Sequence, residues 1–229
     1  MKTLKDLKIE PIQELEPEVR NEEQPIIPDQ AVITDYMLTN PNLVGYETPE
    51  QQESIYRMAA HGFNIASMAD FGCGRGDFGS YVSKVINPNV KYIGIDTNKL
   101  MIDIGATKYS STLPNLEFKQ FNCFDLSAEE PEADIMSEWV FNVLNLSIPY
   151  GNTSLGPKEQ LDKLIDISLA HCTVGTVFIL INTRSKFDGY YQYPQGGLIQ
   201  VLESKNLRFS IDNSEIMDIY KLVIFKQTY

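Results

Sequence analysis

A glycine-rich turn that follows an apolar run constrains the fold of this chain more than any other feature. The apolar run ends in Ala69-Asp70-Phe71, and the turn continues as Gly72-Cys73-Gly74-Arg75-Gly76-Asp77-Phe78-Gly79. Glycines at alternate positions tolerate positive φ and carry no Cβ, so the backbone can approach a ligand and point its N–H groups toward it. The stretch therefore predicts a strand, a tight turn and a helix arranged around a nucleoside cofactor.

Strand-like apolar runs alternate with helical patterns along most of the chain. The expected strands are 65–71, 91–95, 116–122, 133–137 and 176–182. The expected helices are 49–61, 78–86, 99–109, a break-rich segment around 140–146, and 157–170. Because the strands are too apolar to have one solvated face, the alternation predicts an α/β fold with a doubly wound, mostly parallel sheet and helices on both faces.

The end of the chain has a different pattern. A last helix near 197–204 is followed by two strands, 208–211 and 218–226, which lie only a few residues apart. A short connection suits an antiparallel pair, since parallel strands need a long crossover. We therefore expect an antiparallel hairpin at one edge of the sheet, which brings the sheet to seven strands.

The first 29 residues differ in composition from the rest. They are dominated by Glu, Lys and spaced prolines, and such a segment cannot bury much apolar surface. We expect an N-terminal arm over 1–29 and a single domain over 30–229. The arm is either a solvated tail or a segment that orders against a partner protein.

The charge of the chain bears on its partners. A formal charge of −12 and a pI of about 4.6 would repel a phosphate backbone, so small-molecule or protein partners are favoured over nucleic acid. No secretory signal is visible, and no apolar stretch approaches the ~20 residues that span a bilayer. The three cysteines, at 73, 123 and 172, lie far apart without a CxxC pair, which predicts reduced thiols, no zinc site and a cytoplasmic location.

Two cofactor patterns share the glycines of the turn. Gly74-x-Gly76-x-x-Gly79 fits the dinucleotide pattern, and Asp70-x-Gly72-x-Gly74-x-Gly76 fits the nucleoside-methionine pattern. The dinucleotide register would extend the strand through Gly72 and Cys73, which are poor strand residues. Asp96, at the end of the second expected strand, supports either cofactor, because one carboxylate there can accept both ribose hydroxyls.

These motifs, in this order, resemble the class I S-adenosylmethionine-dependent methyltransferases over about residues 44–226. In that family a first strand ending in an acid enters GxGxG, and the second strand ends in an acid. The resemblance implies seven strands, helices on both faces, and S-adenosylmethionine lying across the carboxyl ends of the first two strands. The cofactor contacts that it implies are Asp70, Gly72, Cys73, Gly74, Gly76, Asp96, Asn122, Cys123 and Glu138.

Asn122 departs from the family pattern. Residues 116–125 resemble the third strand and its turn, where an acid commonly meets the adenine amine, and Asn122 holds that place. An amide oxygen can still accept a hydrogen bond from the amine, and Asp125 is the alternative acid.

The segment 134–144 resembles the family's fourth strand and the residues that border the transferred methyl, among them Asn142. The implied mechanism is in-line attack of an acceptor on the sulfonium methyl, with positioning and desolvation supplying most of the acceleration. An acceptor that must lose a proton needs a base, and Glu138 is the candidate. The alternative for Glu138 is a charge at the start of a helix.

The sequence defines the methyl acceptor less well than the cofactor. The stretch Ser137-Glu138-Trp139-Val140 lacks the Asn/Asp-Pro-Pro-aromatic tetrapeptide of base-amino methyltransferases. After the fifth expected strand, a polar and aromatic loop could hold an acceptor, with Arg184 binding a carboxylate or phosphate and Tyr190 stacking on a ring, or could be a surface loop. Tyr46 could cover the cofactor as part of an N-terminal lid, or pack the end of the arm.

We therefore expect S-adenosylmethionine-dependent methyl transfer to a small molecule or a protein. One alternative is a catalytically silent structural or regulatory subunit attached through its N-terminal arm, since fold alone does not fix function. Another is an NAD-dependent oxidoreductase, although the sequence has no Tyr-x-x-x-Lys pair to support it.

Overall fold

The computed structural model describes residues 33–62, 65–109, 111–126, 143–145, 155–181, 192–213 and 219–226. Its strands form one sheet in the order β3-β2-β1-β4-β5-β7-β6. Their bounds are β1 Ser67–Phe71, β2 Lys91–Asp96, β3 Leu116–Gln120, β4 Val143–Asn145, β5 Gly175–Ile181, β6 Arg208–Asn213 and β7 Ile219–Phe225. The expected α/β architecture is confirmed, and the arm predicted over 1–29 lies outside the described residues.

Strand direction divides the sheet into two parts. The pairs β1–β2, β2–β3, β1–β4 and β4–β5 are parallel. The last two strands form the expected antiparallel hairpin, with β7 between β5 and β6. After β3 the chain returns to β4 on the other side of β1, so the strand order reverses beside β1, where open parallel sheets bind their ligands.

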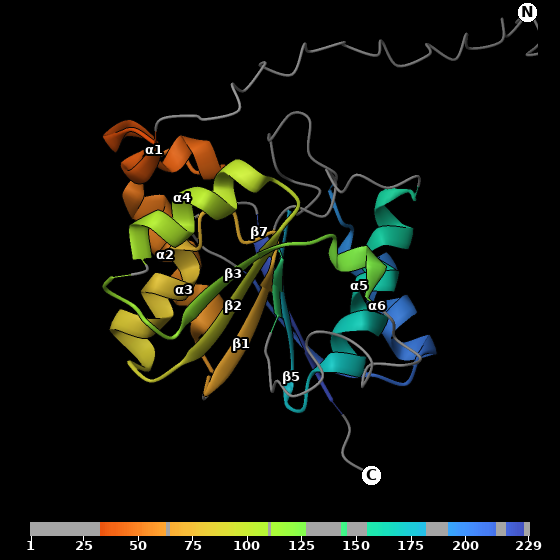
Figure 1. Ribbon diagram of the computed structural model, residues 1–229. Coiled ribbons are helices and arrows are strands. Elements are labelled where there is room, and N and C mark those ends of the chain that lie inside the picture. The colour runs from red at the N-terminus through yellow and green to blue at the C-terminus, as the bar shows by residue number, and fades with distance from the viewer. Residues whose placement is uncertain are drawn as a thin grey trace, which may run out of the picture. The chain divides into compact units, whose positions relative to one another are not determined.

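Helices cover both faces of this sheet. Their bounds are α1 Asp35–Thr39, η2 Pro41–Val44, α2 Pro49–Ala60, α3 Asp77–Tyr81, η3 Val82–Ile86, α4 Lys99–Tyr109, η4 Cys123–Asp125, α5 Pro157–His171 and α6 Gln195–Ser204. Helices α2, α3 and α4 lie on one face, and α5 and α6 lie on the other (Figure 1). None of the described helices is both long and apolar enough to cross a bilayer.

Two hydrophobic cores follow from the alternation of side chains along β1. Ala69 and Phe71 belong to the core that contains the buried residues of α5 and α6, whereas Met68 belongs to the core beneath α2, α3 and α4. All three side chains are at most 1% exposed. A strand buried on both faces explains why apolar residues point to both sides of β1, with Asp70 as the buried exception.

Most expected helices are found close to their expected bounds. Helix α2 begins after Thr48, whose Oγ1 accepts a hydrogen bond from the Gln51 N–H at 3.1 Å, with Pro49 in the first turn. The helix expected over 78–86 is observed as α3 followed by the π-helical turn η3, in which the Asn87 N–H donates to the Val82 carbonyl at 2.9 Å.

The helical segment expected around 140–146 is wrong for Val143–Asn145. These residues form β4, which pairs with β1 through Ala69↔Val143 and with β5 through Leu144↔Val177. Three residues are too few to show the alternating pattern of a strand in the sequence. These residues are a strand because they pair with β1 on one side and β5 on the other. The strand expected over 133–137 lies outside the described residues.

Candidate functional site

The glycine turn leaves β1 directly after Phe71. Gly72, Gly74 and Gly76 have φ values of 72°, 54° and 76°. The strand therefore does not continue through Gly72, as the dinucleotide register would require, and the alternate glycines supply the left-handed backbone that other residues rarely adopt. A Cβ on Gly76 would lie 2.2 Å from Phe118 Cε1, so this position also lacks room for a side chain.

The first N–H groups of the turn bind other parts of the protein. The Gly72 and Cys73 N–H groups donate to the Ile95 carbonyl at 2.8 and 3.1 Å, and the Gly76 N–H donates to the Cys73 carbonyl at 2.9 Å. The expectation that the turn presents its N–H groups to a ligand is therefore wrong for these positions. The Gly72 and Cys73 hydrogen bonds join the turn to the end of β2, and the Gly76 hydrogen bond lies within the turn.

Asp96 ends β2 and reaches back to the turn. Its Oδ2 accepts from the Gly74 N–H at 2.8 Å, and its Oδ1 accepts from the Asn98 N–H at 2.8 Å. Burial raises the pKa of Asp96, while the backbone hydrogen bonds, above all those from Asn98 and Gly74, oppose the shift. A carboxylate has about four acceptor positions, so two bonds leave capacity for a pair of ribose hydroxyls.

Asp70, near the end of β1 before the glycines, is buried inside the protein. Its side chain is 3% exposed and accepts a hydrogen bond from the Tyr92 hydroxyl at 2.9 Å. Burial raises the pKa of Asp70 to about 8, although the Tyr92 hydrogen bond opposes the shift. Gly94, which pairs with Asp70 across β1 and β2, leaves room for the Tyr92 hydroxyl, because a Cβ there would lie 3.0 Å from it.

The turn after β3 brings the two adenine candidates together. Asn122 Oδ1 accepts from the Phe124 N–H at 3.2 Å, and its Nδ2 donates to Asp125 Oδ1 at 3.2 Å. Burial raises the pKa of Cys123, between them, to about 12, which keeps the thiol protonated at neutral pH.

This turn adjoins the end of β2, because the Phe121 N–H donates to the Asp96 carbonyl at 3.0 Å. The structure therefore gathers the glycine turn, Asp96 and Asn122 at one edge of the sheet.

The residues expected to contact the acceptor are only partly described. Tyr46 is 7% exposed and packs edge-to-face against Tyr56, with ring centroids 5.6 Å apart, which agrees with the packing alternative. Burial raises the pKa of Tyr46 above its ordinary value. The remaining candidates lie outside the described residues: Glu138, Asn142, Arg184 and Tyr190.

Arg75 and Asp77 are polar residues of the turn that the sequence argument did not assign. Arg75 is 1% exposed, and its Nε lies 2.6 Å from Asp77 Oδ2. Asp77 also accepts hydrogen bonds from Lys108 and Tyr109 of α4. The sequence does contain a pattern that could have identified them: Arg75 and Asp77 alternate with glycines in the turn. Charged side chains need partners once such a turn is buried, and these two are close enough to pair.

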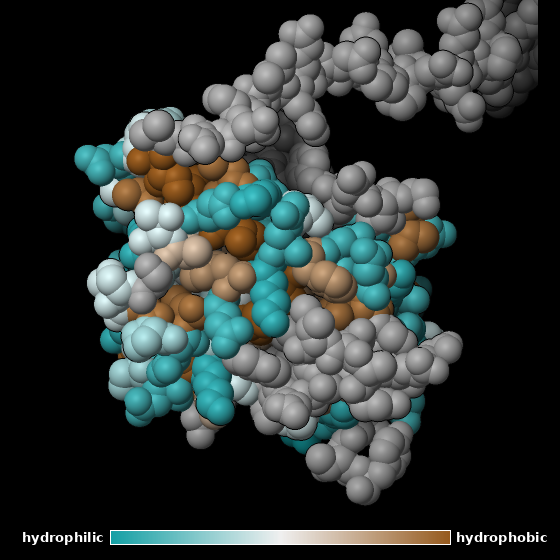
Figure 2. Space-filling view, in the orientation of Figure 1, coloured by the Kyte–Doolittle hydropathy of each residue, from teal (hydrophilic) through white to brown (hydrophobic). Residues whose placement is uncertain are grey.

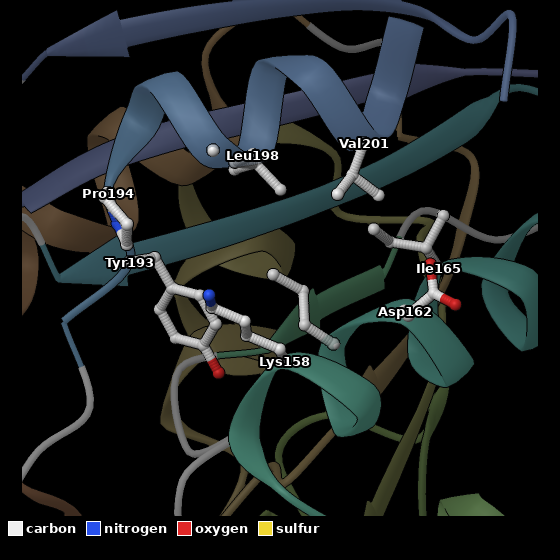
Figure 3. Close-up of a pocket in the computed structure, with 9 residues that line it drawn as sticks. Lys158, Asp162, Ile165, Tyr193, Pro194, Leu198 and Val201 are labelled. Atoms are coloured by element: carbon white, nitrogen blue, oxygen red, sulfur yellow. The ribbon is translucent and has the colours of Figure 1, made fainter. Parts of the chain in front are cut away.

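A pocket of about 100 Å³ lies between α5 and α6. Its lining residues are Lys158, Leu161, Asp162, Ile165, Tyr193, Pro194, Gly197, Leu198 and Val201. Tyr193 and Lys158 lie together at one end, and Ile165 and Val201 lie at the other (Figure 3). Leu161 and Leu198 share a hydrophobic core with Phe124 of η4, and α5 packs against η4.

Metal binding has no visible basis in the part of the chain that the structure describes. Within it, no three His, Cys, Asp or Glu side chains form a group that could hold a metal ion.

Comparison with known proteins agrees with this architecture. A family model described as a methyltransferase domain matches residues 68–147, which include the glycine turn, Asp96 and the turn after β3. No curated protein matches the sequence significantly.

Solved structures share the fold at low sequence identity. A SAM-dependent methyltransferase from Aquifex aeolicus has a TM-score of 0.54 and 15% identity, over 82% of this chain and 94% of that one. SAM-bound CalS10 from Micromonospora echinaspora, an amino pentose methyltransferase, has a TM-score of 0.57 and 12% identity, over 86% and 99%.

An O-methyltransferase family protein from Burkholderia thailandensis also scores 0.57, with 10% identity, over 78% of this chain and 56% of that one. Enzymes with different acceptors thus match equally well, so the likeness establishes the fold and does not select an acceptor.

Proposed function

We propose that the chain is a class I S-adenosylmethionine-dependent methyltransferase, which transfers the sulfonium methyl group to a small-molecule acceptor. The cluster formed by the glycine turn, Asp96 and Asn122 carries this proposal, because it joins three strand ends beside the reversal of strand order.

Each part of the cluster suits one part of the cofactor. Asp96 would accept the ribose hydroxyls with the acceptor capacity that remains to its carboxylate. Asn122, or Asp125 in its place, would accept from the adenine amine. Asp70, at the root of the turn, remains a proposed contact for the methionine part.

Bound S-adenosylmethionine supplies an electrophilic methyl group, so the protein's part is to align the acceptor and exclude water. Glu138 is proposed as the base for an acceptor that must lose a proton. Asn142, Arg184 and Tyr190 remain proposed contacts for the acceptor, whereas the burial of Tyr46 favours a packing role.

The pocket between α5 and α6 supports a small-molecule acceptor with an apolar part. Its walls are mainly aliphatic, and Tyr193 and Pro194 directly follow the segment that contains Arg184 and Tyr190. At about 100 Å³ it suits one small group of a ligand, not the whole of it. The rest of the acceptor would extend toward the cofactor edge.

Two neighbouring glycines of α6 allow a matched test of the pocket. Gly197 lines it, and a Cβ there would make only an ordinary 3.8 Å contact with Pro194, whereas a Cβ on Gly196 would meet nothing within 4 Å. Once a panel of amines, phenols and carboxylates with small apolar groups has identified an acceptor by S-adenosylhomocysteine formation, Gly197→Leu should raise its KM at least tenfold. Gly196→Leu should leave it within twofold.

S-adenosylhomocysteine affinity should be unchanged in both variants. Equal acceptor KM values in Gly197→Leu and the unmodified protein would show that the acceptor does not use this pocket.

A further inference from the structure

Arg75 makes contacts that reach well beyond the glycine turn. Its Nη1 donates to the carbonyls of Met37 and Asn40, both at 2.8 Å, while its Nε binds Asp77. One buried guanidinium thus connects the turn to a segment more than thirty residues earlier in the sequence. Bonds from a charged donor are about twice as strong as neutral ones, and the planar fork of Arg fixes their directions.

Asp77 holds Arg75 in this orientation. Its Oδ2 accepts from Arg75, and its Oδ1 accepts from Lys108 Nζ at 2.7 Å and from the Tyr109 hydroxyl at 2.5 Å. Burial alone would raise the pKa of Asp77, but these donors and the positive charges hold it below its ordinary value. The carboxylate therefore stays ionised and balances the buried guanidinium at neutral pH.

The segment that Arg75 holds lies against the glycine turn. Asn40 joins α1 to η2, and its side chain accepts from the Asn42 N–H at 3.0 Å. At the end of η2, Val44 comes so close that its Cγ1 would lie 2.9 Å from a Cβ on Gly74. Helix α1 packs on α4, and hydrophobic residues gather over α1 beside the hydrophilic surface of α4 (Figure 2).

Gly74 is where these contacts meet the proposed cofactor site. Val44 packs on its Cα side, and Asp96 accepts from its N–H. Fixing the Val44 side of Gly74 therefore also fixes the hydrogen bond that orients Asp96. A site held in its binding geometry before the ligand arrives loses less conformational freedom on binding.

We propose that Arg75 is a positioning residue for the cofactor site: it holds residues 37–44 on the glycine turn and so fixes Gly74 and Asp96 in the geometry that binds the cofactor. The proposal rests on the proposed function for its ligand. Arg75 acts through the backbone of residues 37–44 and need not touch the cofactor.

Lys108 gives a matched control, because it is the other cation on Asp77 and makes no described bond to residues 37–44. The experiment compares Arg75→Gln and Lys108→Gln by calorimetric titration with S-adenosylhomocysteine and by amide hydrogen exchange of residues 37–46. Arg75→Gln should weaken the affinity at least tenfold and speed exchange of the Asn40 and Tyr46 N–H groups, which bond to Tyr36 and Pro41 carbonyls. Lys108→Gln should change both by less than twofold.

A second variant keeps the test informative if Arg75→Gln fails to fold. Val44→Ala removes the contact with Gly74 and leaves the charged cluster in place, and it should weaken S-adenosylhomocysteine binding several-fold. The positioning role is refuted if Val44→Ala and Arg75→Gln bind as tightly as the unmodified protein, or if Lys108→Gln loses as much affinity as Arg75→Gln. If the unmodified protein does not bind S-adenosylhomocysteine, the proposed function fails, whereas exchange at Asn40 and Tyr46 still shows whether Arg75 holds the segment.

Discussion

Asp96 combines a structural and a proposed ligand-binding task in one carboxylate. Its two oxygens accept from N–H groups on different sides, Gly74 in the turn and Asn98 before α4. These bonds set the direction of the carboxylate before any ligand binds. An acid at the end of β2 is predictable from sequence, but its bond to Gly74 depends on how closely the turn folds back toward β2.

Asp70 is expected to make folding pH-dependent. Its pKa is raised from an ordinary value of 3.8 to about 8 in the folded protein, so between these values the folded state keeps a proton that the unfolded state has lost. The stability that the protonated carboxyl contributes is therefore full below about pH 4. It declines as the pH rises from about 4 and is lost once the pH has passed about 8. The slope inside this window should approach about 1.4 kcal/mol per pH unit.

Urea unfolding at pH 5, 7 and 9 tests this expectation. The unmodified protein should lose stability across the series, and Asp70→Asn should lose markedly less, because an amide cannot ionise. Asp77 does not interfere, since its lowered pKa places its own loss of stability at acid pH. Parallel losses in the two proteins would mean that Asp70 is not the group that titrates.

Among the elements, the glycine turn needs Gly76 for two separable reasons. Its φ of 76° is unfavourable for other residues, and a Cβ would lie 2.2 Å from Phe118 Cε1. Gly62 shares only the first reason, with a φ of 87° and no atom within 4 Å of its Cβ position. Gly62→Ala should therefore lose about 1–2 kcal/mol, and Gly76→Ala about 1–3 kcal/mol more from overpacking.

Urea midpoints of the two variants provide the measurement. Equal destabilisation of Gly62→Ala and Gly76→Ala would show that Phe118 moves aside without cost, and that only the backbone conformation requires glycine in the turn.

Sequence patterns identified the elements with a clear period and clear ends. The helix expected over 99–109 matches α4, and β2 and β5 each begin or end within one residue of expectation, because long apolar runs and helix signals are local. Helix α1 and η2 were not predicted. They are short, they contain no buried residue, and Arg75, a tertiary partner, fixes the turn between them.

At the scale of the whole molecule, the position of the site follows from topology. Strand order reverses between β1 and β4, and the glycine turn leaves β1 at that point. The resemblance to class I methyltransferases placed the cofactor there from sequence. The roles of individual residues were harder to predict from the sequence. The hydrogen bonds of Gly72 and Cys73 to Ile95, and the burial of Asp70, arise only when the chain folds.

The overall charge of −12 favours a small-molecule or protein acceptor over a nucleic acid. The part of the site expected to hold that acceptor includes Glu138 and Arg184, which lie outside the described residues. Cofactor binding is therefore the claim to test before any acceptor is sought.

Calorimetric titration with S-adenosylhomocysteine and S-adenosylmethionine, and in parallel with NAD, shows whether the site binds the proposed cofactor. We expect dissociation constants on the order of micromolar for both sulfur nucleosides, and an affinity at least about tenfold weaker in Asp96→Ala, because hydrogen bonds to a charged group are lost. Asp103→Ala, which removes an exposed carboxylate paired with Lys99 on α4, should bind normally. If well-folded protein binds neither sulfur nucleoside, the cofactor assignment is wrong, whether or not the protein binds NAD.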